Sequence, residues 1–295
     1  MITFRNYLDE DYQSDYQSVC DFLIELNERE RNHINWNWAR WEWMYRHPEF
    51  DNSLIGSIGL WLDGERIVGA AIYDMYFGEG FCGALPEYDR LYPEILDYAC
   101  GKLSDEDGFA FAICESDDSL IEAARKAGFA KADQSEHMLS IPLEGNFAPA
   151  LPEGYSLAEL DPVKELCEFQ WLLWQGFDHG DDRAAFELEN DVTMRITEFR
   201  RHFNPELSVA AVNGAGENGA YCCMWYDART DYAYVEPVCV IPSFRGKGIG
   251  KAVVQEALRR AKALGAECAY VISDMDFYRK LGFADDRHFS FWRKK

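Results

Sequence analysis

Short apolar runs, separated by turn residues, follow the same order twice along the chain. In each half, two apolar segments flank a turn, at Asp63-Gly64 and again at Asn213-Gly214. A two-residue turn of this composition between apolar runs is a strong β-hairpin signal. The four segments are residues 54–62, 67–76, 208–212 and 220–226. The pattern therefore predicts one hairpin in each half of the chain.

Each hairpin is followed by the pattern of a strand, a helix, a strand and a short helix that ends in Gly-Phe, at Gly128-Phe129 and Gly282-Phe283. The near-constant offset between the halves indicates a duplication. Between the halves, residues 143–155 are rich in proline and glycine and read as a linker. We expect an α/β protein with two similar mixed β-sheet domains flanked by helices, at residues 1–145 and 152–295.

The clearest single element is a helix over residues 250–264. Val254, Leu258, Ala261 and Leu264 recur at helical spacing, and Gly265 follows as a C-terminal stop. The four tryptophans between residues 36 and 43 are interpreted as core packing in preference to a cage for a cation.

Composition excludes several classes of protein. Of the 295 residues 48% are hydrophobic, but no apolar run approaches the ~18 residues of a membrane span. The first residues carry no apolar signal core, so we expect a cytoplasmic protein that binds no membrane. The nine cysteines include no Cys-x-x-Cys pair, which favours free thiols and predicts neither disulfides nor a metal site.

The net charge of −23 argues against binding nucleic acid and favours a cationic partner. The charge is uneven, because residues 1–150 hold 11 basic and 29 acidic residues (11 − 29 = −18) and residues 151–295 hold 18 and 23 (18 − 23 = −5). Residues 244–262 hold six basic residues against the single acid Glu256. An anionic cofactor would meet least repulsion in this second half.

A strand, a glycine-rich turn and a helix start follow one another between residues 235 and 251. Glycines at 246, 248 and 250 let consecutive backbone N–H groups converge on an anion, with the positive end of a helix dipole behind them. A nucleotide-triphosphate loop would need Ser or Thr after Gly246-Lys247, where Gly248 stands. A dinucleotide fingerprint would need another glycine at Lys251 or Val253.

The pattern Arg245-x-x-Gly248-x-Gly250 resembles the pyrophosphate loop of the GNAT superfamily of N-acetyltransferases. The resemblance continues to Tyr278, four residues before Gly282-Phe283, and covers residues 207–292 well and the first half in outline. It implies acetyl-CoA as cofactor. It further implies that the backbone of residues 238–240 holds the pantetheine arm and that residues 245–251 hold the pyrophosphate. These expected cofactor contacts are Val238, Cys239, Val240, Arg245, Gly246, Lys247, Gly248, Ile249, Gly250 and Lys251.

Two residues are predicted to be catalytic. By the resemblance Tyr278 lies near the thioester sulfur, where a protonated hydroxyl assists departure of the thiolate. The family often has asparagine where this chain has Val271, so we expect the short helix to begin at Ser273 or Asp274, both good caps. Glu236 interrupts an apolar strand and is the first choice for the base that deprotonates the amine, with pairing to an arginine as the alternative.

The segment before the second hairpin is expected to line the acceptor pocket, by analogy with the family. Its candidate residues are Trp174, Phe177, Asp178 and His179, the last two being rival bases. The first half has no such loop: residues 87–94 contain no glycine, and Ala124 stands where the second half has Tyr278. We therefore expect the first half to bind no CoA.

The leading hypothesis is direct transfer of an acetyl group from acetyl-CoA to a primary amine of a small cationic molecule, by a monomer or homodimer. Alternatives are an acyl-CoA sensor without catalysis, an acetyltransferase acting on peptide or protein amines, and an interaction scaffold. The scaffold leaves the basic, glycine-rich loop unexplained.

Overall fold

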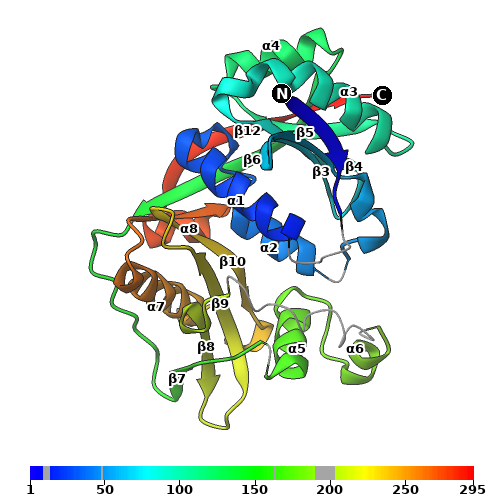
Figure 1. Ribbon diagram of the computed structural model, residues 1–295. Helices are drawn as coiled ribbons and strands as arrows, with labels where there is room; N and C mark the ends of the chain where they lie inside the picture. Colours follow the sequence, from blue (N-terminus) through cyan, green and yellow to red (C-terminus); the bar gives the residue numbers. More distant parts are fainter. Residues whose placement is uncertain (9–13, 48, 163, 190–202) are drawn as a thin grey trace. The chain divides into compact units, whose positions relative to one another are not determined.

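The computed structural model describes residues 1–8, 14–47, 49–162, 164–189 and 203–295. The chain forms two compact units (Figure 1). The first unit comprises Met1–Leu139, Ile272–Asp274 and Asp285–Lys295, and the second comprises Ser140–Val271 and Met275–Ala284. The two units are therefore not consecutive pieces of the sequence, because the C-terminal strand belongs to the first unit.

The first unit begins with an antiparallel sheet covered by helices. Its strands before the crossover are β1 (Ile2–Asn6), β2 (Gly59–Asp63), β3 (Arg66–Asp74) and β4 (Tyr76–Ala84), and β2 and β3 form the predicted hairpin. Its helices are α1 (Ser14–Arg29), α2 (Trp38–Arg46), α3 (Tyr92–Lys102) and α4 (Asp118–Lys126), with 3-10 turns at Arg31–His33, Asn52–Ser57 and Pro86–Leu91. Residues 54–57, expected to be strand, lie in one of these turns because the Asp51 side chain caps it through the N–H of Ser53.

The first sheet is completed by strands that are distant in sequence. β5 (Phe109–Cys114) runs parallel to β4, β6 is Ala130–Pro142, and β12 (Ala284–Lys294) lies between β5 and β6 (Figure 1). β12 pairs antiparallel with β5 from Phe289↔Cys114 to Lys294↔Phe109. The end of the chain thus supplies a central strand of the first unit, a pairing that no local sequence pattern encodes.

Three of the four tryptophans between residues 36 and 43 are core residues, as predicted, and Trp43 is half-buried. Trp36, Trp38 and Trp41 are each 2% exposed or less. Trp36 stacks on Phe81 with ring centroids 5.2 Å apart. Rings of this size bury large apolar areas and stabilise the fold chiefly through that burial. They are packed inside the first unit and do not form an open cage.

The second unit repeats the arrangement. Its strands are β7 (Tyr155–Ala158), β8 (Ser208–Asn213), β9 (Asn218–Tyr226), β10 (Tyr232–Val240) and β11 (Cys268–Ile272), in the spatial order β11-β10-β9-β8-β7. Its helices are α5 (Leu166–Gly176), α6 (Arg183–Glu189), α7 (Ile249–Leu264) and α8 (Asp276–Leu281), with 3-10 turns at Pro205–Leu207 and Pro242–Phe244. α7 and α5 pack on opposite faces of this sheet (Figure 1). Residues 143–154 contain no helix or strand, as the linker prediction required.

Helix α7 has the boundaries that the sequence predicts and three of the four predicted buried positions, because Leu264 is 40% exposed. Val254, Leu258 and Ala261 are fully buried, and Gly265 ends the helix in the left-handed conformation. Each buried Val or Leu side chain contributes about 1.5–3 kcal/mol. The helix is therefore fixed firmly behind the loop that precedes it. No helix in the described part of the chain is long and apolar enough to cross a membrane.

Candidate acyl-CoA site

Strands β10 and β11 run parallel and then part. They pair only at Tyr232, Ala233 and Tyr234, whereas β10 continues to pair with β9 as far as Val240. A β-bulge between Val235 and Val238 interrupts the β9 register, and Pro237 has no N–H to donate. The edge of β10 beyond the bulge therefore has no strand partner on the β11 side within the described residues. The pantetheine arm is expected along this unpaired edge of β10.

The loop after β10 leaves its backbone open to solvent at two glycines. Gly246 and Gly248 have φ angles of 72° and 82°, and a Cβ atom added to either would meet nothing within 4 Å. Gly248 is the N-cap of α7 and provides no side-chain cap, so the N–H groups of the first turn lack the acceptor that Ser or Asp would supply. Open left-handed glycines before an uncapped helix form a backbone cradle for an anion.

Gly250, also expected in the cradle, has a packing role as well. A Cβ atom there would lie 2.9 Å from Cγ2 of Val240, so glycine allows the start of α7 to approach the end of β10. Ile249 is 1% exposed and anchors the same turn in the core, whereas the Lys251 side chain is exposed. Of these three residues, Lys251 is the one whose side chain is available to a phosphate.

The cations of the loop are held in place by the protein. Arg245 donates from Nε to the Val240 carbonyl (2.8 Å) and from Nη2 to the Gly176 carbonyl (2.9 Å). Its Nη1 lies 2.9 Å from Oδ1 of Asp178. Lys247 donates to the hydroxyl of Tyr155 (2.9 Å) and the carbonyl of Ser243 (2.7 Å). Arg245 thus ties the loop to β10 and to the end of α5.

Tyr278 lies on α8 and is 8% exposed. Its ring packs against Phe277 and Phe283, with centroids 5.0 and 5.6 Å away. Burial raises the pKa of the hydroxyl, and the nearby Cys222 and Glu236 raise it further. The group therefore keeps its proton at neutral pH. The expected helix start at Ser273 or Asp274 is wrong: α8 begins at Asp276 with Met275 at the N-cap.

Glu236 is half-buried on β10, within the β-bulge between Val235 and Val238. Its carbonyl accepts a 2.7 Å hydrogen bond from Nε1 of Trp225, which fixes the backbone at the bulge. The Glu236 carboxylate acts electrostatically on Tyr278, whose pKa it raises. The two candidate catalytic side chains therefore lie within electrostatic reach of each other.

Cys239 faces away from this surface. It is 4% exposed, and its thiol lies 3.8 Å from the Leu172 carbonyl. Burial raises the pKa of the Cys239 thiol to about 12, so the thiolate needed for nucleophilic catalysis is scarce at neutral pH. All nine cysteines are free thiols. The arrangement of Cys239 suits a packing role for its side chain.

The four residues expected in an acceptor pocket lie in and just after α5. The rings of Trp174 and His179 lie tilted against each other with centroids 4.9 Å apart, and Phe177 is 49% exposed. The Asp178 carboxylate forms an ion pair with Arg245. The backbone of Asp178 is in the left-handed conformation, with φ at +65°. Asp178 therefore positions the loop arginine, a contact that its place in the sequence does not predict.

Several neighbouring residues carry no motif in the sequence. Tyr155 holds Lys247, and Trp225 holds the carbonyl of Glu236. Gln170 Nε2 and Trp174 Nε1 are buried on α5 without a hydrogen-bond partner among the described residues. The sequence does not predict these hydrogen bonds, because the partner of an isolated Gln, Tyr or Trp side chain depends on which element packs against it.

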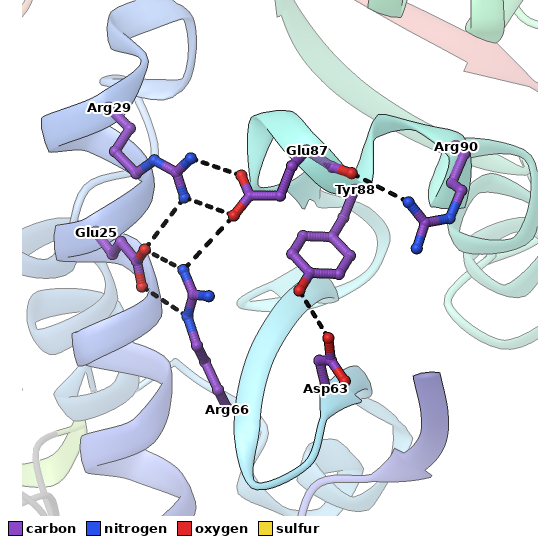
Figure 2. A network of polar contacts seen from close by, with 7 residues as sticks. All are labelled: Glu25, Arg29, Asp63, Arg66, Glu87, Tyr88 and Arg90. Atoms are coloured by element: carbon purple, nitrogen blue, oxygen red, sulfur yellow. Dashed lines mark hydrogen bonds and ion pairs between the residues drawn. The ribbon is translucent and has the colours of Figure 1, made fainter. Parts of the chain in front are cut away.

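The first unit treats the equivalent position differently. Its strands β4 and β5 also part, since they pair only at Glu79↔Ala110 and Gly80↔Phe111. The turn that follows, Pro86–Leu91, is closed by side chains (Figure 2). Glu87 pairs with Arg29 at 2.6 Å and lies 3.9 Å from Arg66, which also binds Glu25.

Comparison with known proteins defines the class. The model of the acetyltransferase (GNAT) family matches residues 165–283. A tandem GNAT protein from the clavulanic acid biosynthesis pathway superposes with a TM-score of 0.66 at 16% identity, covering 100% of this chain and 98% of that one. A GCN5-related N-acetyltransferase from Sphaerobacter thermophilus gives 0.57 at 15% identity, covering 99% and 95%. One from Kribbella flavida gives 0.51 at 16%, covering 81% and 86%.

No curated protein gives a significant match to the sequence. The similarity to the solved structures, all below 25% identity, concerns the fold. The fold is that of a tandem GNAT protein, and residues 165–283 form a GNAT acetyltransferase domain. The residues that match the acetyltransferase family lie in the second unit, except for Ile272–Asp274.

Proposed function

We propose that the protein transfers an acetyl group from acetyl-CoA to a primary amine of a small cationic molecule, within one ternary complex. The observation that carries this proposal is the parting of β10 from β11 beside the open glycines of the loop. Backbone groups of residues 238–240 would hold the pantetheine arm, and residues 245–251 would hold the pyrophosphate. Acetyl-CoA supplies the activated acetyl thioester.

The chain's own residues manage two protons in this proposal. Glu236 accepts a proton at its carboxylate from the incoming ammonium group, directly or through a water. Tyr278 holds a proton at its hydroxyl, because burial raises its pKa, and donates it where thiolate charge develops. The buried Cys239 thiol takes no part, which favours direct transfer over a covalent acetyl-enzyme.

The nature of the acceptor rests on charge and on the end of α5. The net charge of −23 attracts cations. Trp174, Phe177 and His179 offer aromatic surface, on which an amine gains cation–π contacts. These features favour a small polar amine over a long peptide, for a protein acting as a monomer or homodimer.

An acetyl-CoA consumption assay across amine classes tests the proposal with the full chain. We expect turnover with a small polyamine or amino sugar and little with peptides. Turnover with peptide or protein amines alone would replace the small-molecule acceptor by the peptide alternative. Tight acetyl-CoA binding without turnover on any amine would favour the sensor, and absence of binding would contradict the assignment of the site.

A further inference from the structure

Two histidines and an aspartate converge in the first unit, and none of them is among the residues of the acyl-CoA site. His137 lies on β6, and Asp285 and His288 lie on β12. One potential ligand atom from each of the three lies within 4.8 Å of the other two. The imidazole rings of His137 and His288 meet edge to face with centroids 4.5 Å apart.

We propose that His137, Asp285 and His288 form a divalent transition-metal site, with Zn²⁺ as the ion they suit best. Two imidazoles and a carboxylate are a ligand set that Zn²⁺ accepts, whereas Mg²⁺ and Ca²⁺ prefer oxygen ligands only. Three protein ligands leave a fourth tetrahedral position for water. Ligand atoms about 2.1 Å from one tetrahedral ion lie roughly 3.4 Å from one another. Side-chain rotations that move these three ligand atoms by about 1 Å would therefore bring them to that spacing.

The backbone of the site is held by hydrogen bonds on both strands. The His137 carbonyl accepts from the N–H of Ser273 (2.9 Å), and the His288 carbonyl accepts from the N–H of Glu115 (2.9 Å). The Glu115 carboxylate is fixed by Ser290 at 2.6 Å and Lys131 at 2.9 Å. Ligands on anchored strands lose less freedom when a metal binds than ligands on loops.

Such an ion would fasten β12 to β6. The two strands lie side by side in the first unit but come from the end and the middle of the chain. A ligand that binds only the folded state stabilises it by mass action. Zn²⁺ bound here would therefore link the C-terminal strand to β6 and stabilise their pairing. The sequence gives no metal signature because the ligands come from distant segments.

Calorimetric titration of tag-free, chelator-treated protein with Zn²⁺ tests the site. We expect one Zn²⁺ per chain, a rise in Tm on its addition, and no equivalent binding of Mg²⁺. The double variant His137→Gln, His288→Gln should weaken Zn²⁺ binding by at least 100-fold and lose the Tm rise. Asp285→Asn should weaken binding by about tenfold or more.

Controls separate this site from general metal binding. His47→Gln, which removes a histidine elsewhere in the first unit, should leave the stoichiometry and affinity unchanged. Co²⁺ should give the intense visible bands of a tetrahedral site in the wild type and lose them in the double variant. The proposal is wrong if the wild type shows no saturable Zn²⁺ binding, or if a folded double variant binds Zn²⁺ as tightly as the wild type.

Discussion

The turns that follow β4 and β10 occupy equivalent places in the two units and have opposite designs. Both come where two parallel strands have parted. After β10 the chain offers bare backbone, with Gly246 and Gly248 in left-handed conformations and open space around them. After β4 the chain offers side chains, and Glu87 is tied to Arg29 and Arg66 (Figure 2). In the proposed function the loop, and not the parting of the strands, distinguishes the unit that binds the diphosphate.

The same contrast recurs at the short helix of each unit. Both helices end before a left-handed glycine, Gly128 at φ 90° and Gly282 at φ 105°. Four residues earlier the first unit has Ala124 and the second has Tyr278, both buried. A methyl group fills the position in one unit, whereas a proton-carrying hydroxyl fills it in the other. In the proposed mechanism this difference places the proton donor in the second unit, and single substitutions can test it.

The largest expected effect is that of Tyr278→Phe. The variant keeps the ring packed between Phe277 and Phe283 and removes the hydroxyl. We expect kcat to fall about 10²-fold with acetyl-CoA affinity nearly unchanged. Because the pKa of Tyr278 is raised, the hydroxyl stays protonated at and below pH 9, so the loss should be the same from pH 6 to pH 9. Steady-state kinetics across this range measure it, and an unchanged kcat would remove Tyr278 from the mechanism.

Glu236→Gln should have a comparable effect only at the low end of that range. The amide keeps the shape of the side chain and removes the base. We expect a loss on the order of 10²-fold at pH 6, shrinking as the pH approaches the pKa of the acceptor amine. The difference in shape between the two pH profiles cannot arise from a general loss of stability. A pH-independent loss would show that Glu236 has a structural role.

Gly248→Val tests the backbone cradle itself. A β-branched side chain in the loop should block approach of a diphosphate and raise the Kd for CoA by tenfold or more, about 1.4 kcal/mol. The left-handed conformation alone costs a non-glycine residue about 1–2 kcal/mol of stability. Gly216→Val is the matched control, because Gly216 has the same φ of 82° and the same open surroundings in the β8–β9 turn. Calorimetry should show weaker CoA binding for Gly248→Val alone. Equal affinities would contradict the cradle.

Local patterns predicted much of this fold. The β8–β9 hairpin, helix α7 and the linker were each marked by turn residues or by periodicity, and the structure has them close to the expected bounds. The tandem fold followed from the repeated order of elements. Signals of this kind are short in range, so they predict elements well. The place of β12 beside β5 depends on long-range pairing and carried no such signal.

Only part of the geometry of the candidate site could be predicted, for the same reason. The left-handed conformation of Gly246 and Gly248 could be predicted because glycine favours it. The partners of the charged side chains could not be predicted, because they depend on the tertiary structure. Arg259 and Arg260, counted among the cations near the loop, both bind the carboxylate of Glu256 at 2.7 Å. Part of the predicted positive field is therefore neutralised on α7 itself.

Glu256→Gln should affect stability more than binding. Hydrogen bonds and charge from Arg259 and Arg260 lower the pKa of Glu256 to about 2, from an ordinary value of 4.5. A carboxyl group whose pKa is lower in the folded state than in the unfolded state stabilises the fold at any pH above the unfolded-state pKa. For Glu256 this stabilisation disappears as the pH falls from about 4.5 towards 2. We expect a loss of about 1–2 kcal/mol at pH 7, allowing for the half-exposed Arg259. Denaturant unfolding should show this loss shrinking below pH 4.

Two controls separate the effect of this ion pair on stability from the effect of an exposed ion pair and from an effect on CoA binding. Glu122→Gln removes a similar helix pair with Lys126, but one exposed to solvent on both sides, and should change stability much less. The CoA Kd of Glu256→Gln should stay within about threefold of wild type, because the proposed pyrophosphate contacts come from residues 245–251. A tenfold change would show that the charge balance of the whole helix contributes to binding.

The smallest expected effect is that of Glu87→Gln in the first unit. The substitution breaks the ion pairs with Arg29 and Arg66, all on exposed side chains, where screening by water keeps such pairs weak. Removing the negative charge still leaves a turn without glycine or an open backbone, so it should create no anion site. We expect one CoA per chain by calorimetry before and after the change, with Kd values within twofold. A second CoA per chain in either protein would show that the first unit binds CoA, because the stoichiometry counts sites directly and does not depend on catalysis.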